Sequence, residues 1–393
     1  MKKCLVITFS PLKHDSRVLR QLSALSEDFE VTVCHPEPGE IYPWRQIELS
    51  SEALRKTPGL HGYLLRFGAL RFGFKVIRNT LLLLGVFKLQ GFLPGSQTAV
   101  ARSSLRQHRF EEVDLIVAND VQTLPIAFEL AGDKVPVYAD LHEYSPGEIP
   151  RKGLINRSRL NWNKWVCARF LSRCRTVSVV SQTIADLYKT SFGVEPQVIP
   201  NYPNKYDIKP SRVAENSIQL VHHGVYGPVR GVEEMIIALS KSSIPATLNL
   251  VLAGAPVDQL TALVRKENLR PGQVRFHPFT APDRLIPFLN DFDAEVIFTA
   301  PTSANGAATL PNKFFEAIQS RLAVLTGPSS EIARIVQKED IGLVSASFSN
   351  DDLAQVFSRL NAQLISGWKK NSDQLAHNLN WETIKPKYLD FID

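Results

Sequence analysis

Cysteine is scarce in this chain of 393 residues, which contains four: Cys4, Cys34, Cys167 and Cys174. They show no paired short spacing and have no histidine partners at the distance of metal ligands. A disulfide scaffold and a cysteine zinc site are therefore excluded. Reduced thiols of this kind are typical of a cytosolic protein, and we expect that location.

Long hydrophobic runs are also missing. The uncharged stretch at residues 79–87 spans about nine residues, whereas a membrane-spanning helix needs about 20. At the N-terminus a short apolar run leads into the charged segment 13–17 without a cleavage-type segment, which predicts a buried first strand rather than a signal peptide. The hydrophobic content of 44% is that of a soluble globular protein.

Acidic side chains are absent between residues 53 and 110, while the same segment carries ten Lys or Arg residues. Because the whole chain has a net charge of +6, the remainder is negative, and this basic insert predicts contact with something anionic. In residues 61–95 large apolar side chains are interspersed with cations, among them Arg66, Arg71, Lys75 and Arg78. This pattern is typical of a helix on an anionic bilayer, and a solvated cationic helix face is the alternative. No recognised binding motif for nucleic acid accompanies it, so we expect no such partner.

Short apolar, β-branched runs alternate with segments of helical period, which is the signature of parallel sheets covered by helices on both faces. The predicted strands are 3–9, 30–34, 114–118, 135–139, 176–180, 197–199, 218–222, 247–252, 274–277, 294–299, 322–325 and 342–344. The predicted helices include 16–26, 121–131, 231–240, 258–267, 283–289, 311–320 and 330–336. This order predicts an α/β protein with two doubly wound, Rossmann-like domains.

A polar, aperiodic stretch with two prolines, residues 201–216, predicts the domain boundary. We expect a first domain at 1–202 that contains the basic insert 53–110, a linker at 203–216 and a second domain at 217–380. The last segment, 381–393, is expected to pack back on the first domain as a helix. The cleft between the domains is then the expected ligand site.

Two polar segments follow predicted strands of the first domain. After the first strand, Asp15 or Ser16 is expected to cap the next helix, and no glycine pair is present for a close approach to phosphate. After the strand 135–139, His142 can share a proton near neutral pH, and Glu143 is placed to orient it. His142 is a candidate catalytic residue, and a hydrogen-bonded loop histidine is the alternative.

The segment 222–231 follows the first strand of the second domain and runs into a helix. Its three glycines, which include Gly224, let the backbone come close to a ligand, and Arg230 supplies a planar cation for phosphate. The spacing is not GxGxxG. The two histidines, His222 and His223, have no third ligand nearby, so we expect no metal.

The segment 305–316 joins a predicted strand to a helix that begins at about Pro311. Small residues at 306–308 leave room for a sugar-sized group. Lys313 and Glu316 are three residues apart and share a face of the first helical turn, where the helix dipole and free N–H groups attract phosphate. We expect Lys313 to face a phosphate and Glu316 to accept hydrogen bonds from a ribose. An ordinary strand-to-helix turn is the alternative.

Five segments, in this order, make the chain similar to the family-four glycosyltransferases, which are retaining enzymes of the GT-B fold and include transferases of bacterial surface polysaccharides. The segments are 15–20 (DSRVLR), 119–125 (NDVQTLP), 138–143 (YADLHE), 198–203 (VIPNYP) and 310–316 (LPNKFFE). The likeness covers nearly the whole chain.

The resemblance implies roles for particular residues. His142 matches a family histidine that contacts the donor sugar, and Arg230 matches the basic residue that binds the donor diphosphate. Of the family's two glutamates, Glu316 matches the second, which binds the ribose, whereas Ala308 stands where the first would bind sugar hydroxyls. The family's second basic residue in this part of the chain is missing, and we assign its task to Lys313.

The implied reaction is transfer of a glycosyl unit from a nucleoside diphosphate sugar, the donor, to a hydroxyl of a glycan or lipid-linked acceptor, with retention at the anomeric carbon. We expect no metal or other cofactor, and a peripheral position on the inner face of the cell membrane. The candidate catalytic residues are His142, Arg230 and Lys313. The candidate donor-binding residues are Gly224, Arg230, Asn305, Gly306, Pro311, Asn312, Lys313 and Glu316. The candidate acceptor or membrane residues are Asp15, Arg66, Arg71, Lys75 and Arg78.

Two alternatives stay open at this point. Nonhydrolysing sugar-nucleotide epimerases share the two-domain architecture and would release a rearranged nucleotide sugar without an acceptor. A noncatalytic protein that binds sugar nucleotides is compatible with Ala308 and with the missing glycine-rich loop.

Overall fold

The computed structural model describes residues 1–37, 42–50, 77, 79–81, 83–87, 96–106, 108, 113–149, 152–227 and 229–392. It divides into two compact units. Unit 1 consists of Met1–Ile199, Ser303–Asn305 and Lys385–Asp393, and unit 2 consists of Pro200–Thr302 and Gly306–Ile384. Four cations of the basic insert, Arg66, Arg71, Lys75 and Arg78, lie outside the described residues.

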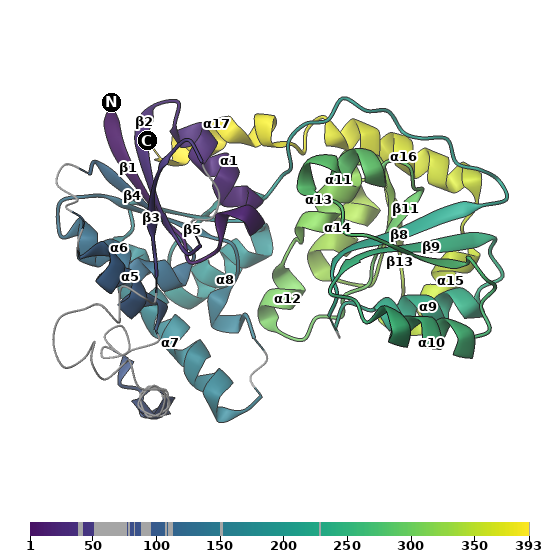
Figure 1. Cartoon of the computed structure of the whole chain (residues 1–393), viewed down its shortest axis with the longest axis horizontal. Helices are drawn as coiled ribbons and strands as arrows, with labels where there is room; N and C mark the ends of the chain where they lie inside the picture. The colour runs from purple at the N-terminus through teal and green to yellow at the C-terminus, as the bar shows by residue number, and fades with distance from the viewer. Residues whose placement is uncertain are drawn as a thin grey trace. The chain divides into compact units, whose positions relative to one another are not determined.

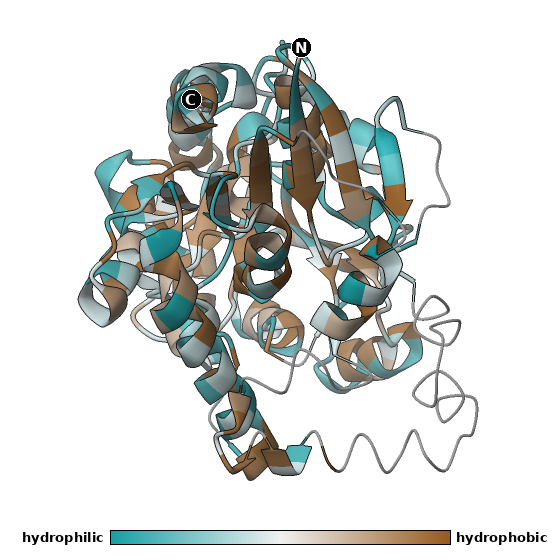
Figure 2. Cartoon of the chain, turned by 90° about the vertical axis from the view of Figure 1, so that its left-hand side faces the viewer, coloured by the Kyte–Doolittle hydropathy of each residue, from teal (hydrophilic) through white to brown (hydrophobic). Residues whose placement is uncertain are grey.

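Unit 1 is built on a parallel sheet of seven strands in the order β3-β2-β1-β4-β5-β6-β7. The strands are β1 (Lys2–Ile7), β2 (Phe29–His35), β3 (Arg45–Glu48), β4 (Leu115–Asn119), β5 (Val137–Leu141), β6 (Thr176–Val179) and β7 (Gln197–Val198). Strands β4 and β5 are buried along their whole length, and Figure 2 shows the hydrophobic colour along the inner strands of this sheet. Such two-sided burial is what helices on both faces of a parallel sheet require.

The helices of unit 1 cover both faces of its sheet. The α-helices are α1 (Ser16–Leu25), α5 (Gln97–Leu105), α6 (Leu124–Ala131), α7 (Leu154–Phe170), α8 (Gln182–Phe192) and, from the end of the chain, α17 (Trp381–Ile392). The short 3-10 helices are η1 (Leu12–His14), η3 (Val121–Thr123), η4 (Ser145–Gly147) and η5 (Leu171–Arg173). Figure 1 shows α1 and α17 on one side of the sheet and α5, α6 and α7 on the other.

Unit 2 has a parallel sheet of six strands in the order β10-β9-β8-β11-β12-β13. The strands are β8 (Ile218–Val225), β9 (Ala246–Ala253), β10 (Val274–His277), β11 (Ala294–Ile297), β12 (Ala323–Thr326) and β13 (Gly342–Val344). The helices are α9 (Val232–Lys241), α10 (Val257–Lys266), α11 (Pro282–Leu289), α13 (Asn312–Gln319), α14 (Ser330–Lys338), α15 (Asn350–Ser358) and α16 (Ala362–Ala376). The short helix α12 (Ala304–Ala308) belongs to unit 1 through Asn305 and to unit 2 from Gly306. In Figure 1, α9, α10 and α15 lie on one face of this sheet and α11, α13 and α16 on the other.

The prediction of an α/β protein with two doubly wound sheets is confirmed. Two local predictions are corrected. Strand β3 was not predicted, because Arg45–Glu48 is an edge strand with charged ends rather than an apolar run. The segment expected as a loop before Leu310 contains the short helix α12, whose small residues carry no apolar period.

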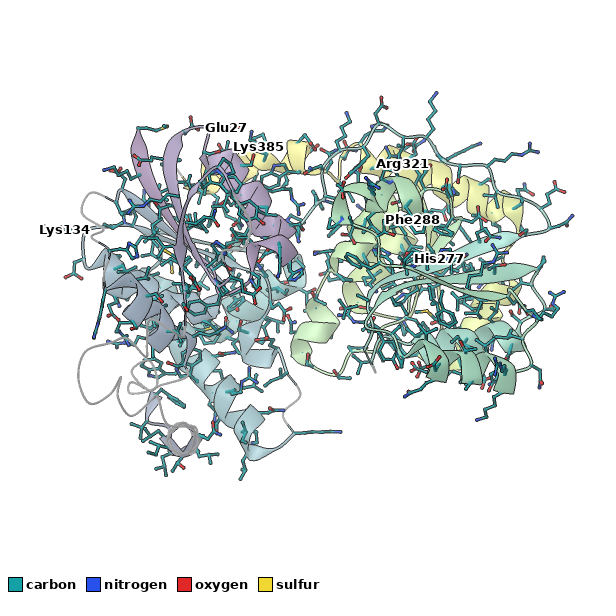
Figure 3. The ribbon with its side chains drawn as sticks, in the orientation of Figure 1. Glu27, Lys134, His277, Phe288, Arg321 and Lys385 are labelled. Carbon is teal, nitrogen blue, oxygen red and sulfur yellow. The ribbon has the colours of Figure 1, made fainter. Side chains whose placement is uncertain are left out.

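The last helix packs within unit 1 through its final two turns. The amine of Lys385 donates to both carboxylate oxygens of Glu27, at 2.5 and 2.7 Å, and Figure 3 labels this pair. The ring of Phe391 meets that of Tyr138 edge to face, and its carbonyl oxygen accepts from the Thr176 hydroxyl at 3.0 Å. Within the described ranges, no helix is both long enough and apolar enough to cross a bilayer.

Each sheet has one point where the strand order reverses, at β1 and β4 in unit 1 and at β8 and β11 in unit 2. The loops that leave such a pair at its carboxyl end run to opposite faces of the sheet, which opens a crevice between them. Ligands of doubly wound proteins bind at this position. The polar residues at these strand ends therefore stand where a doubly wound protein binds its ligand.

Candidate functional site

A buried carboxylate, Asp140 of β5, organises the carboxyl edge of the sheet in unit 1. It is fully buried, and the Arg17 guanidinium donates two hydrogen bonds to it, at 2.7 Å to Oδ2 and 2.6 Å to Oδ1. The Gln21 amide and the Ser178 hydroxyl also donate to it. Burial alone would raise the pKa of Asp140, but the charge and hydrogen bonds of Arg17 hold it well below its usual range.

His142 follows β5 and is held by two carboxylates. Its Nε2 lies 3.2 Å from Oδ2 of Asp140, and its Nδ1 lies 3.7 Å from Oδ2 of Asp120. The backbone N–H of His142 donates to Oδ1 of Asp120 at 3.1 Å. Burial lowers the pKa of His142, but the Asp120 charge and the hydrogen bond to Asp140 outweigh it and raise the pKa to about 9. His142 is therefore positively charged at neutral pH.

Glu143 was expected to orient His142, and the structure gives that task to Asp120 and Asp140 instead. The carboxylate of Glu143 accepts a hydrogen bond from the Asn305 amide at 2.8 Å, and the Asn305 carbonyl oxygen accepts from the backbone N–H of Tyr144 at 2.8 Å. Burial, followed by the charges of nearby acids, raises the pKa of Glu143 to about 7. Asn305 thus takes part in the polar contacts of unit 1.

Two further polar groups lie near the reversal point of unit 1. Asp15 caps α1, because its Oδ1 accepts from the backbone N–H of Val18 at 3.1 Å. Asn119, the last residue of β4, is 1% exposed, and neither its amide nitrogen nor its oxygen has a hydrogen-bond partner among the described residues. Asn119 lies opposite Asp140 in the register of β4 and β5.

In unit 2 the candidate residues meet at the carboxyl end of β8. The Lys313 amine, from the first turn of α13, lies 3.4 Å from Nε2 of His222. A Cβ atom on Gly224, which has a φ of +119°, would lie 3.5 Å from this amine. The Nδ1 of His222 donates to the Val296 carbonyl at 2.7 Å, and burial followed by the Lys313 charge lowers the pKa of His222 well below its usual value. His222 is therefore neutral, and its Nε2 accepts from Lys313.

Lys313 is itself nearly buried, at 6% exposure. Burial lowers its pKa to about 8, and among the nearby charges Glu295 and Glu316 oppose this shift while Arg230 adds to it. The amine is thus mostly protonated at neutral pH, but it lacks a close anionic partner within the described residues of unit 2. An anion at the start of α13 would raise its pKa.

His223, the next residue of β8, lies between two carboxylates. Its Nδ1 is 3.0 Å from Oε2 of the fully buried Glu295, and its Nε2 is 2.9 Å from Oε2 of Glu316, whose side chain is 25% exposed. Burial lowers the pKa of His223, but the Glu295 charge and the hydrogen bonds to both carboxylates raise it to about 9.

The loop after β8 brings a second cation toward Lys313. Arg230 is partly exposed, and its charge reaches both Lys313 and His222. Gly231 then caps α9 with a φ of +72°, and a Cβ atom there would lie 2.2 Å from the Phe298 carbonyl oxygen. Only glycine fits this close approach of the loop to the end of β11.

The remaining candidates of the 305–316 segment lie around the start of α13. Pro311 is the N-cap of α13, and Asn312 accepts a hydrogen bond from the Asn201 amide at 2.7 Å. Gly306 is half-buried in α12, and Ala308 is buried at 1% exposure. The structure therefore brings Gly224, Lys313 and Glu316 together, with Arg230 close enough to act on Lys313 by its charge.

The basic insert is partly described. Arg102 of α5 is paired with Glu129 of α6, where its Nη2 lies 2.5 Å from Oε2. Ala99, Ala101 and Leu105 of the same helix are buried. The end of the insert is thus an ordinary part of unit 1, and the other cations that motivated the membrane prediction fall largely outside the described residues. The described part of the chain also contains no group of three or more His, Cys, Asp or Glu side chains placed to hold a metal ion.

Four charged residues of these clusters were missed by the reasoning from sequence: Arg17, Asp120, Asp140 and Glu295. A signal existed for Glu295, because a carboxylate in the middle of an apolar strand is costly without a partner. Asp140 also lies in a buried strand, two residues before His142. Arg17 gave no such signal, since it looked like one more cation on the surface of an amphipathic helix.

The raised pKa of His142 predicts a pH dependence of stability. Since the pKa moves from 6.5 to about 9, the stabilisation by its charge is fully present below about pH 6.5 and is lost as the pH rises through about 9. We expect His142→Asn to lower the free energy of unfolding by on the order of 3 kcal/mol at pH 6, and by much less at pH 10. Denaturant unfolding at several pH values measures this. His14→Asn, at an exposed histidine, is the control, and a pH-independent effect of His142→Asn would contradict the prediction.

Two family profiles match the chain over most of its length. The family described as Glycosyltransferase Family 4 matches residues 17–202, and the family described as Glycosyl transferases group 1 matches residues 218–363. No curated protein sequence matches the chain significantly.

Solved structures of similar fold include glycosyltransferases. Sucrose-phosphate synthase from Thermosynechococcus elongatus is 16% identical, with 100% of this chain and 98% of that one covered and a TM-score of 0.72. HepE from Anabaena, in complex with UDP-glucose, is 17% identical, with 100% and 99% covered and a TM-score of 0.68. WaaG, a glycosyltransferase involved in lipopolysaccharide biosynthesis, is 16% identical, with 99% of each chain covered and a TM-score of 0.64.

The two sheets and their helices form the Rossmann-like pair of the GT-B fold, and at these identities the solved structures support the fold alone. The family profiles add the sequence relationship, in the same order along the chain as the two units. The chain belongs to the family-four glycosyltransferases of the GT-B fold.

Proposed function

We propose that this chain transfers a glycosyl unit from a nucleoside diphosphate sugar to an acceptor hydroxyl. The observation that carries the proposal is the cluster of Lys313, Glu316 and Gly224 at the carboxyl end of β8, beside the reversal point of the sheet in unit 2. The HepE structures with UDP and UDP-glucose support a donor of this class.

Lys313 and Arg230 are assigned to the donor diphosphate. Lys313 is a nearly buried cation with a lowered pKa. Burial disfavours its protonated form, and the negative charge of a diphosphate beside it stabilises that form. The first turn of α13 adds free backbone N–H groups and the positive end of the helix dipole. Because negative charge grows on the diphosphate as the glycosidic bond breaks, both cations stabilise the transition state more than the bound donor.

Glu316 is assigned to the ribose of the donor. Its side chain is part-exposed, and its Oε2 is fixed by His223, so the carboxylate keeps acceptor capacity for the two neighbouring hydroxyls of a ribose. Gly306 and the small residues after it are assigned to the sugar. Ala308 cannot bond the sugar hydroxyls as the family's first glutamate does, so this chain recognises its sugar with other groups.

His142 is assigned to the transferred sugar, as the family resemblance implies. It carries a positive charge at neutral pH because Asp120 and Asp140 hold it. We propose transfer with retention: the bond from the anomeric carbon to the leaving phosphate breaks, the acceptor oxygen bonds to the same face, and the phosphate takes the acceptor proton. Arg230 and Lys313 supply positive charge to the diphosphate, and we propose that no divalent ion is needed.

The proposed acceptor is a glycan or lipid-linked molecule at an anionic membrane surface. Ile77, Leu83 and Leu84 in the described part of the insert are exposed, at 49%, 48% and 71%. Leu154 and Ile155 in the first turn of α7 are exposed as well, at 66% and 53%. Phe87 and Trp165 are in ring contact at 6.1 Å, which links the insert to α7. Exposed apolar groups beside cations such as Arg157 are what peripheral binding to an anionic bilayer uses.

The donor assignment predicts the effect of two substitutions. Lys313→Met and Glu316→Ala should each weaken the binding of a nucleoside diphosphate by about tenfold or more, because a charged hydrogen bond is worth about 1.5–3 kcal/mol. Titration calorimetry over a panel of nucleoside diphosphates measures this, after a thermal-shift screen has found the preferred base. Lys338→Met and Glu339→Ala, at an ion pair at the C-terminal end of α14, are matched controls. Full affinity in both site variants would contradict the assignment.

The membrane assignment predicts the effect of removing cations from the basic insert. Replacing Arg66, Arg71, Lys75 and Arg78 with Ser should weaken binding to vesicles that contain anionic lipid, by about 1 kcal/mol for each cation near the surface. Vesicle co-sedimentation with anionic and neutral lipid measures this. A control variant replaces four cations of unit 2 with Ser: Lys241, Arg265, Lys266 and Arg284. Unchanged vesicle binding in the insert variant would rule out this surface as the membrane contact.

A further inference from the structure

We propose that His223, held by Glu295, is a positioning residue that fixes the Glu316 carboxylate for a ribose, so that nucleotide binding depends on the charge of this buried histidine. The inference rests on the proposed function, because it takes Glu316 as the residue that binds the ribose. It adds two residues, His223 and Glu295, that do not themselves touch the donor.

The topology of the sheet brings the three residues together. Strands β8 and β11 are parallel neighbours, and Val221 pairs with Glu295 in their register. His223 is two residues beyond Val221, so its side chain lies on the same face of the sheet as Glu295. Helix α13 covers this face, since its Phe314 and Ile318 share a core cluster with Val221. Glu316 reaches His223 from this helix.

The hydrogen bonds define the protonation state of His223. Both ring nitrogens lie within 3.0 Å of a carboxylate oxygen, Nδ1 at Glu295 and Nε2 at Glu316. A carboxylate only accepts, so both nitrogens must carry a proton and the ring must be an imidazolium. The backbone N–H of His223 also donates to Oε1 of Glu295 at 3.2 Å. Glu295 is thereby held at both oxygens by one residue, and it fixes the plane of the ring.

The bond to His223 determines where the Glu316 carboxylate points. A glutamate on a helix surface samples several rotamers, and ordering it costs free energy. Here Oε2 is fixed at 2.9 Å from the ring nitrogen, and among the residues that the structure describes none donates to Oε1. The carboxylate is thus oriented before the ligand arrives, and this lowers the entropic cost of binding a diol.

A purely structural role does not account for the triad of Glu295, His223 and Glu316. Glu295 is fully buried in a strand whose other residues are apolar, and a hydrophobic residue there would give comparable or greater stability. Instead, the buried carboxylate of Glu295 and the buried imidazolium of His223 hold the part-exposed carboxylate of Glu316. Of these three side chains, Glu316 is the one that a ligand can reach.

The charge of His223 sets the pH range in which the triad exists. Its pKa is raised from 6.5 to about 9, so the imidazolium and its stabilisation are fully present below about pH 6.5 and are lost as the pH rises through about 9. Two carboxylates face His223, Glu295 from β11 and Glu316 from α13. Three further titratable or charged groups act on its neighbours: His222 of β8, Lys313 of α13 and Arg230 of the loop before α9. Lys313, with a pKa of about 8, titrates in the same range, so a pH profile of binding alone does not isolate His223.

The measurement that isolates His223 is how much more tightly the chain binds a nucleotide with a ribose than one whose sugar lacks the 2′ and 3′ hydroxyls. Titration calorimetry at pH 7.5 compares a nucleoside diphosphate with its 2′,3′-dideoxy counterpart. In the double variant His223→Leu/Glu295→Leu, which removes both buried charges together, we expect the preference for the ribonucleotide over the dideoxynucleotide to fall about tenfold. The loss of the Glu295 charge also acts on Lys313, but that effect is the same for both nucleotides and cancels in the ratio. His377→Leu, at an exposed histidine of unit 2, should keep the wild-type ratio.

The outcomes separate the inference from the proposed function. A double variant that keeps the wild-type preference for ribose overturns the inference and leaves the proposed function standing. A wild-type chain that binds no nucleoside diphosphate, or binds both nucleotides equally, overturns the assignment of Glu316 itself. If the double variant does not fold, NMR of ¹⁵N-histidine in the wild-type chain gives the answer: we expect both ring nitrogens of His223 to be protonated at pH 7.5, and a neutral ring would overturn the inference.

Discussion

A carboxylate buried within a parallel strand has to be surrounded by hydrogen-bond donors, because an unpaired buried charge costs several kcal/mol. Both units of this chain contain such a carboxylate, Asp140 on β5 and Glu295 on β11. Each one holds a charged histidine beside the reversal point of its sheet, His142 in unit 1 and His223 in unit 2. The positions of His142 and Glu316 depend on these two interactions.

The consequence for chemistry is that charge is fixed before a ligand binds. His142 stays protonated because two aspartates hold it, and Lys313 stays close to His222 and Gly224 because α13 starts at the end of β8. Groups held in this way need little reorganisation when charge develops on a ligand beside them. The carboxylates raise the pKa of both histidines to about 9, so both lose their charge as the pH rises through that value.

The fold and part of the site could be predicted from the sequence. Two doubly wound sheets follow from the alternation of apolar strands and helical segments. His142 stands just after a strand, and Lys313 and Glu316 stand in the first half of a helix. The buried partners could not be predicted, because a cation such as Arg17 looks the same on a solvated helix as it does against Asp140 across 123 residues. Strand β3 was missed for the reason that edge strands carry charge. The contact of Asn305 with Glu143 could not be predicted from the sequence either, because it joins residues 162 positions apart.

The central claim is that a nucleoside diphosphate sugar gives up its sugar here with its diphosphate held by Lys313 and Arg230. The most direct measurement is glycosyl transfer by the purified chain in the presence of EDTA, with the anomeric configuration of the product read by NMR. The account predicts turnover that EDTA does not reduce, and a product with the same anomeric configuration as the donor. Loss of turnover in EDTA that a divalent ion restores, or a product of inverted configuration, would contradict it.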